Sequence, residues 1–208
     1  MHVALLGDSI FDNAAYTGRD PDVISHLRSL LPRDAAATLC AVDGATVAGL
    51  TAQLRSVPPT ATHLVVSVGG NDALQHFDLL SMRMSSSAEA LAEFARRIDP
   101  FERAYREAVA QVLALGLPTI LCTVYNGRLD NTVARSARLA LALFNDVILR
   151  TAVERRLDAI ELRLVCDHAS DYANPIEPSG TGGFKIARVI VRAISATASA
   201  HPVARVWA

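Results

Sequence analysis

The chain has 208 residues, of which 51% are hydrophobic and 20% charged, and 20 Lys and Arg against 21 Asp and Glu give a net charge of −1. This composition is typical of a globular chain with one sizeable core and excludes a disordered chain. The balanced charge excludes a basic track for nucleic acid or an anionic membrane, and no apolar stretch approaches the roughly 18 residues that span a bilayer. The apolar run Val3–Leu6 is too short for a signal segment and lacks a basic lead, so we expect a cytoplasmic protein.

Five short apolar runs predict strands. They lie at Val3–Leu6, Ala37–Val42, His63–Val68, Thr119–Val124 and Ile160–Cys166. The first four runs are almost continuously apolar, as in parallel strands that are covered on both faces. The fifth run alternates between apolar and charged residues, which predicts an edge strand with one wetter face.

Helical patterns fill the intervals between the predicted strands. The first helix is expected to start at Asp20 and Pro21 and to reach about Leu31, because an acid followed by proline is typical of a helix start. Pro100 is expected to divide a later helical region into two pieces. Further helices are expected around residues 47–54, 133–148 and 187–194. The alternation of strands and helices predicts one α/β domain over residues 1–208, with a parallel sheet between two layers of helices.

The three cysteines, Cys40, Cys122 and Cys166, are far apart and lie in apolar runs. Their spacing is not that of a metal site or of a disulfide framework. We interpret them as small buried hydrophobic residues in a reducing compartment.

Small and polar residues follow each predicted strand. These segments are Gly7–Asn13, Asp43–Thr46, Gly69–Asp72, Tyr125–Gly127 and Asn174–Gly183. Parallel strands end at one edge of a sheet, so we expect these segments to meet there. A serine at a strand-to-helix turn would expose its hydroxyl above a helix N-terminus, which makes Ser9 a candidate nucleophile. The backbone N–H groups of Ser9 and Gly44 and the Asn71 amide are candidate donors to an oxyanion.

At these residues the chain resembles the SGNH hydrolases, also called the GDSL esterase/lipase family. Gly7-Asp8-Ser9 corresponds to the block that carries the nucleophile, Gly44 to the second block, and Gly69-Gly70-Asn71-Asp72 to the block whose Asn is an oxyanion donor. The resemblance implies a three-layer α/β/α sandwich with a flavodoxin-like, five-stranded parallel sheet in the order 2-1-3-4-5. It also implies esterase, lipase or deacetylase activity on a small acyl ester, without a metal or an organic cofactor.

The last block departs from the family pattern. The family has Asp-x-x-His, whose His is the general base and whose Asp orients it, whereas this chain has Asn174-Pro175-Ile176-Glu177 before a proline and a serine. Glu177 therefore occupies the base position and Asn174 the orienting position.

Three interpretations follow from this departure. In the first, Glu177 is the base, which requires burial to raise its pKa. In the second, His168, Asp171 or His76 takes the proton. In the third, the site binds an ester or acyl group with little or no turnover. A structural alternative for Glu177 itself is a charge that favours the start of the last helix.

The remaining residues near the blocks have structural alternatives. Asp8 is expected to hold its turn through backbone N–H groups, and Gly44 is expected at a positive φ. Asp72 is expected to cap a helix, which would leave Asn71 for the site.

Further candidates for the pocket wall are Asp8, Asp12, Asn13, Tyr16, His168, Asp171 and Asn174. The sequence thus predicts a serine hydrolase for a small-molecule ester, with an impaired binding module and an acyltransferase as alternatives. A homodimer through an apolar helix face is compatible with the pattern.

Overall fold

The computed structural model describes residues 1–129, 131–196 and 204–208. Its parallel strands form one sheet in the order β2-β1-β3-β4-β5-β6. The strands are β1 (His2–Gly7), β2 (Ala36–Leu39), β3 (His63–Ser67), β4 (Thr119–Cys122), β5 (Asp158–Ile160) and β6 (Val206–Trp207). The predicted α/β fold and the order 2-1-3-4-5 are confirmed, and β6 adds a sixth strand to the five that were predicted.

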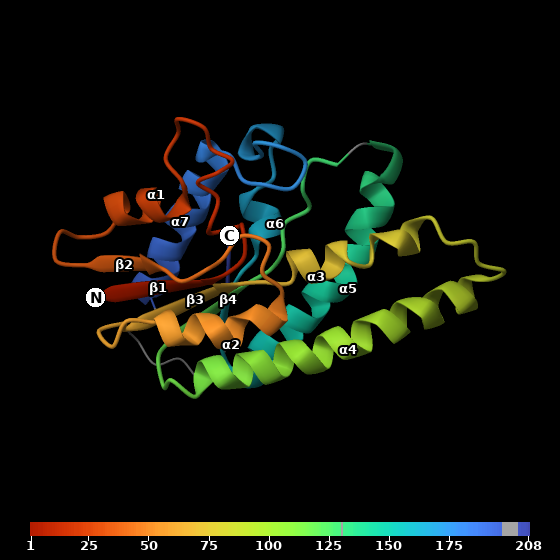
Figure 1. The fold of residues 1–208 in the computed structure, drawn as a ribbon, viewed down its shortest axis with the longest axis horizontal. Coiled ribbons are helices and arrows are strands. Elements are labelled where there is room, and N and C mark those ends of the chain that lie inside the picture. The colour runs from red at the N-terminus through yellow and green to blue at the C-terminus, as the bar shows by residue number, and fades with distance from the viewer. Residues whose placement is uncertain (130, 197–203) are drawn as a thin grey trace.

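Helices cover both faces of the sheet, as Figure 1 shows. The α-helices are α1 (Val23–Leu30), α2 (Leu50–Gln53), α3 (Gly70–Leu74), α4 (Ser87–Leu113), α5 (Asn131–Arg155), α6 (Leu162–Val165) and α7 (Gly180–Ala196). Short 3₁₀ helices are η1 (Val47–Gly49), η2 (Leu54–Ser56), η3 (Phe77–Leu80) and η4 (Ala169–Asp171). One apolar core joins α1, α6 and α7 to the sheet, and a second core joins α2, α4 and α5 to its other face.

The predicted fifth strand, Ile160–Cys166, is wrong in its extent and in its position. The strand ends at Ile160, and the following residues form the single turn of α6. Leu162 is fully buried while Leu164 is 65% exposed, so the alternation in the sequence reflects one turn of helix and not the two faces of a strand. Because β6 pairs with β5, the edge strand on this side of the sheet is β6 and not β5.

Pro100 does not divide the fourth helix, contrary to the prediction. Helix α4 continues through it, because the residues that follow pack against the sheet and hold the second half in place. Phe101 and Tyr105 belong to this buried face. Proline removes one backbone hydrogen bond, which this packing offsets.

Two other predicted helices differ from the structure, one in its start and one in its regularity. Helix α1 is capped by Asp22, whose side chain accepts a hydrogen bond from the Ser25 N–H, so it starts after Asp20 and Pro21. Residues 47–56 form η1, α2 and η2 instead of one regular helix.

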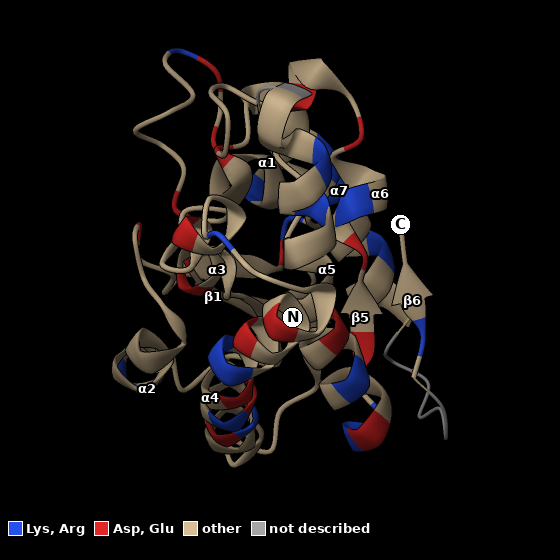
Figure 2. Ribbon diagram, turned by 90° about the vertical axis from the view of Figure 1, so that its right-hand side faces the viewer, with Lys and Arg blue, Asp and Glu red and all other residues tan. Residues whose placement is uncertain are grey.

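The surface carries mixed charge. Figure 2 shows Lys and Arg interspersed with Asp and Glu along α4. Glu102 on α4 binds Arg106 on the same helix and Arg150 on α5, which links the two helices at their outer faces. Within the described residues, no helix has the length and apolar character needed to cross a membrane.

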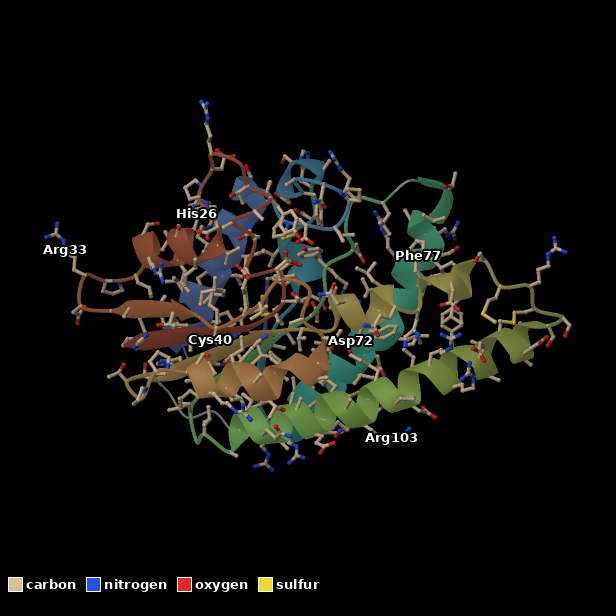
Figure 3. All side chains as sticks on the ribbon, viewed as in Figure 1. His26, Arg33, Cys40, Asp72, Phe77 and Arg103 are labelled. Carbon is tan, nitrogen blue, oxygen red and sulfur yellow. The ribbon has the colours of Figure 1, made fainter. Side chains whose placement is uncertain are left out.

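The three cysteines are free thiols and are buried, as predicted. Burial raises the pKa of each thiol. Cys40 lies between the sheet and α2, where its thiol faces the Ser56 carbonyl (Figure 3). The thiols therefore serve as core residues.

Candidate functional site

Ser9 lies in a single turn directly after β1. Gly7 ends the strand at φ 133°, and a Cβ at this position would lie 1.7 Å from the Ser67 carbonyl oxygen on β3, so glycine alone fits. The buried side chain of Gln53 accepts a hydrogen bond from the Gly7 N–H and donates one to the Gly7 carbonyl. These contacts fix the backbone that presents Ser9, whose residue exposure is 8%.

Ser9 is not at the start of a helix, contrary to the prediction. The Phe11 and Asp12 N–H groups both donate to the Asp8 carbonyl, which closes one turn, and α1 begins only at Val23. Helix-dipole activation of this serine is therefore absent from the site.

Glu177 reaches Ser9 from the loop between η4 and α7. The Ser9 hydroxyl donates a hydrogen bond of 3.1 Å to Glu177 Oε1. Glu177 is 5% exposed, and its Oε2 is buried without a hydrogen-bond partner among the described residues. Glu177, the residue that the sequence resemblance places at the base position, thus contacts the candidate nucleophile directly.

The pKa of Glu177 is raised, mainly because burial disfavours its charged form. The hydrogen bond from Ser9 acts in the opposite direction, and the nearby charge of Asp43 adds to the increase. A carboxylate with a raised pKa is a stronger base than an exposed one, which is what a serine nucleophile requires.

Asn174 contacts the backbone of the loop rather than the Glu177 carboxylate. Its Oδ1 accepts the N–H groups of Ile176 and Glu177, both at 2.9 Å. This is the local turn that asparagine favours. Asn174 therefore sets the direction of Glu177 through the main chain.

Two of the three candidate oxyanion donors, Ser9 and Asn71, lie on the wall of one pocket. The Asn71 amide donates one hydrogen bond to the Ala45 carbonyl at 2.9 Å, and an amide nitrogen carries a second hydrogen. Gly44 lies at φ 76°, as expected, in an exposed turn at the rim of the site. Asn71 and Ser9 lie on the wall of the pocket, whereas Gly44 does not.

Asp72 does not cap α3, contrary to the prediction. Gly69 is the N-cap residue, and the Asp72 carboxylate accepts a hydrogen bond from the Val47 N–H. It thereby joins α3 to η1, the segment that follows the Gly44 turn (Figure 3).

Asp8 is a second buried carboxyl beside the site. Its Oδ1 accepts the Ile10 N–H at 3.1 Å, as expected for a residue that holds the turn. Its Oδ2 makes no hydrogen bond of ordinary geometry and is buried on the pocket wall. Burial raises the pKa of Asp8 to about 7, and the charges of Glu177 and Asp72 add to this, while the N–H groups of Ile10 and Gly70 oppose it.

Other candidates from the first loop have structural contacts. Asp12 accepts the Asp43 N–H at 2.9 Å. Tyr16 donates its hydroxyl to the Asp43 carboxylate at 2.6 Å. Asn13 is fully buried, and it donates to the Pro178 carbonyl and accepts from the Val23 N–H. These residues join the Ser9 loop to its neighbours and do not line the pocket.

The alternative bases have partners other than Ser9. His168 caps η4, and its ring contacts Ser170. Asp171 is fully buried and binds Lys185 at 2.8 Å. His76 lies on the pocket wall, with its ring nitrogen Nδ1 3.1 Å from Arg97. Of the four candidates, Glu177 is the residue that the structure brings to Ser9.

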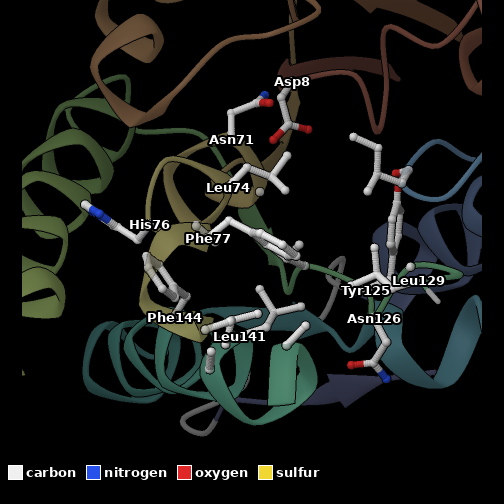
Figure 4. Close-up of a pocket in the computed structure, with 18 of the residues that line it drawn as sticks. Asp8, Asn71, Leu74, His76, Phe77, Tyr125, Asn126, Leu129, Leu141 and Phe144 are labelled. Atoms are coloured by element: carbon white, nitrogen blue, oxygen red, sulfur yellow. The ribbon is translucent and has the colours of Figure 1, made fainter. Parts of the chain in front are cut away.

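A pocket with a volume of about 110 Å³ opens beside Ser9. Figure 4 shows Asp8 and Asn71 at one end of it, with Leu74 and Phe77 between them and the α5 side chains Leu141 and Phe144. The walls come from α3, η3, α4, α5 and the loop after β4. Within the described residues, no cluster of three or more metal-binding side chains is found.

The sequence reasoning missed Gln53, Tyr125 and the α5 wall. Gln53 belongs to no recognised motif. A polar residue within the apolar stripe of a helix could nevertheless have indicated a buried hydrogen-bonding role. Tyr125 was noted only as a strand end, but it donates its hydroxyl to the Ile176 carbonyl at 2.6 Å and so supports the Glu177 loop. The α5 residues follow the same periodicity as a core helix, which does not distinguish a core from a pocket.

A sequence model described as the GDSL-like lipase/acylhydrolase family matches residues 5–202. The chain belongs to this family. Membership in the GDSL-like family confirms the resemblance seen in the three blocks. No curated protein matches the chain in sequence.

Solved structures with the same fold include esterases and lipases. An extracellular lipase from Streptomyces rimosus is 15% identical, with a TM-score of 0.65, 93% of this chain covered and 99% of that one. A phospholipase A1 from Streptomyces albidoflavus is 14% identical, with a TM-score of 0.67 and 92% and 98% covered. A variant of an acetyl xylan esterase from Geobacillus stearothermophilus is 19% identical, with a TM-score of 0.62 and 93% and 94% covered. At these identities the likeness establishes the fold of this GDSL-like chain.

Proposed function

We propose that the chain is a serine esterase in which Ser9 is the nucleophile and Glu177 the general base. The observation that supports this is the hydrogen bond from the Ser9 hydroxyl to Glu177 Oε1 in a buried site. The family supports the reaction class, since its members include lipases and acylhydrolases.

The first half of the proposed reaction forms an acyl-enzyme. Ser9 Oγ attacks the ester carbonyl carbon while its proton passes to Glu177. The negative charge on the carbonyl oxygen is stabilised by the Ser9 and Gly44 N–H groups and by the second hydrogen of the Asn71 amide. Glu177 then returns the proton to the leaving alcohol as the carbon–oxygen bond breaks.

The second half releases the acid. A water molecule attacks the acyl carbon, and Glu177 accepts the proton of that water. The proton then returns to Ser9 Oγ as the acyl bond breaks, so the free enzyme is restored. Glu177 thus carries one proton in each half, and its raised pKa makes it a stronger base than an ordinary Glu.

The nucleophile is tested by labelling with a fluorophosphonate and peptide mass spectrometry. We expect the wild-type chain to be labelled at Ser9 and the Ser9→Ala variant to remain unlabelled. A wild-type chain that resists a reagent able to label a control serine esterase would favour the binding-module alternative.

The base is tested by the Glu177→Gln substitution, which keeps the shape and removes the proton acceptor. We expect kcat for a p-nitrophenyl ester to fall by about 10²–10⁴-fold, the usual contribution of a general base. The matched control is His168→Asn, which keeps a side chain able to cap η4 and should retain wild-type turnover. Equal turnover in Glu177→Gln and wild type would remove Glu177 as the base. Product analysis with added alcohols distinguishes hydrolysis from acyl transfer.

A further inference from the structure

The pocket beside Ser9 has a strongly apolar far end. One face of α5 contributes Ala137, Ala140, Leu141 and Phe144, which are spaced at i, i+3, i+4 and i+7 and so form a single stripe. Leu74, Phe77 and Phe94 contribute to the other walls from α3, η3 and α4.

Leu74 and Phe77 on this wall are 41% and 43% exposed. Large apolar side chains that line a concave site lose contact with water when an apolar ligand enters, which favours binding. An exposed apolar surface inside a pocket therefore indicates what the pocket holds.

The far end has little to offer a polar ligand. Among the described residues, no Lys or Arg lines the pocket, and His76 already has its Nδ1 beside Arg97. Apart from His76 and the Asn126 amide, the side chains labelled at this end in Figure 4 are apolar, so a sugar or a phosphate placed there would lose most of its hydrogen bonds to water without replacement. A saturated alkyl chain makes no hydrogen bonds to water, so it loses none on entering the groove.

An ester has two sides, and the proposed chemistry determines which side enters the pocket. Glu177 must reach the leaving oxygen in order to protonate it, so the alcohol lies on the Glu177 side. Polar groups on that side include Asp43 and Tyr16, which are joined by a hydrogen bond. Asn71 lies at the start of α3. From Asn71 the polypeptide runs along α3 to Leu74, which belongs to the apolar wall of the pocket (Figure 4). The acyl side therefore points along α3 toward α5.

We propose that the groove between α3–η3 and the α5 stripe binds an unbranched, uncharged acyl chain longer than acetyl, with Ala140 setting the depth. This assignment rests on the proposed esterase function and specifies its substrate. Ala137 and Ala140 supply small side chains where larger residues would fill the groove, so these two positions determine the length of chain that fits.

Two isomeric esters test the assignment. Ethyl octanoate and octyl acetate have the same formula, so they differ in which side of the ester carries the long chain and not in composition. We expect kcat/KM to be at least about tenfold higher for ethyl octanoate, since each buried methylene contributes about a three- to fourfold preference. Equal values, or a preference for octyl acetate, would overturn the acyl assignment while leaving the esterase proposal intact.

Ala140→Phe places a ring in the groove. We expect it to lower kcat/KM for ethyl octanoate at least about tenfold more than it lowers kcat/KM for ethyl acetate. The matched control is Leu139→Phe, because Leu139 is on the same helix, is 68% exposed and does not line the pocket. Ala137→Leu is a smaller intrusion that replaces Ala140→Phe if that variant does not fold.

A binding measurement separates this assignment from the proposed function. In the Ser9→Ala background, NMR titration with ethyl octanoate should show binding that Ala140→Phe weakens at least about fivefold and Leu139→Phe leaves unchanged. Equal binding in all three proteins would overturn the groove assignment. If wild-type turnover of both esters does not exceed that of Ser9→Ala, the esterase proposal fails, and the titration still decides the groove.

Discussion

Asp8 and Glu177 are buried carboxyls on the same pocket wall, and both have a raised pKa. The titratable groups that face Asp8 are Glu177, Asp72, Cys122 and Tyr125, and none of them is a cation. A neutral Asp8 adds no further negative charge beside the oxyanion and the ionised Glu177.

This arrangement predicts a bell-shaped pH profile. Glu177 must be ionised to accept a proton, so kcat/KM should rise with pH through a pKa above that of an ordinary Glu. Ionisation of Asp8 at about pH 7 adds a charge that opposes the oxyanion, so kcat/KM should fall at higher pH. Asp8→Asn should remove the alkaline limb and keep the acid limb. An unchanged alkaline limb in this variant would assign it to another group.

The same residue predicts a dependence of stability on pH. The pKa of Asp8 is about 7 in the fold against an ordinary 3.8. The contribution of Asp8 to the free energy of unfolding is therefore complete below about pH 3.8. It is lost as pH rises through 7, because between these pH values the unfolded chain binds fewer protons than the folded chain. Urea unfolding should show a loss of about 3 kcal/mol between about pH 5 and pH 8 in wild type that Asp8→Asn lacks. Equal losses in the two proteins would contradict the buried neutral acid.

At the scale of elements, the start of α7 packs against the loop that carries Glu177. A Cβ on Gly182 would lie 2.1 Å from the Asp171 carbonyl oxygen, and the same carbonyl accepts the Ser179 N–H. Gly182→Ala should lower the free energy of unfolding by at least about 2 kcal/mol and reduce turnover, because the loop must move. Thr181→Ala, one residue earlier and exposed, is the control that should leave both unchanged. Alanine favours helices, so a stabilised Gly182→Ala would show that the contact is not tight.

The elements show what the sequence could and could not predict. Continuous apolar runs identified β1 and β3 because both are buried on two faces. Periodicity failed at residues 160–166, where one helical turn imitates a strand, and at β6, whose two residues are too short for a pattern. The helix-breaking effect of Pro100 was overestimated, because local helix propensity does not include the packing of Phe101 and Tyr105.

The site shows the same division. The loops at the strand ends were predicted from topology, and the pairing of Ser9 with Glu177 was one of three interpretations. Contacts between distant residues decide among such interpretations, and those depend on packing. Asn13 and Asp171 illustrate this, since both were pocket candidates and both are buried in structural contacts.

At the scale of the whole molecule, β6 closes the sheet far from the site. Arg205 binds the carboxylate of Asp158 on β5, which is 7% exposed, and β3 and β4 lie between β5 and β1. Arg205→Ala should lower the free energy of unfolding by about 2–4 kcal/mol, because the buried Asp158 carboxylate loses the guanidinium and keeps only the backbone N–H of residue 205. Turnover of the folded protein should not change. The double variant with Asp158→Asn should recover part of the loss in urea unfolding, and no recovery would mean that the pair is not coupled.

The loop that carries Glu177 is held by its main chain. Four consecutive carbonyls, those of Pro175, Ile176, Glu177 and Pro178, accept hydrogen bonds from Arg128, Tyr125, Ala173 and Asn13 respectively. Every amino acid has a carbonyl, so none of these four bonds depends on which side chain stands at position 177. The loop can therefore keep its path when another side chain stands at position 177.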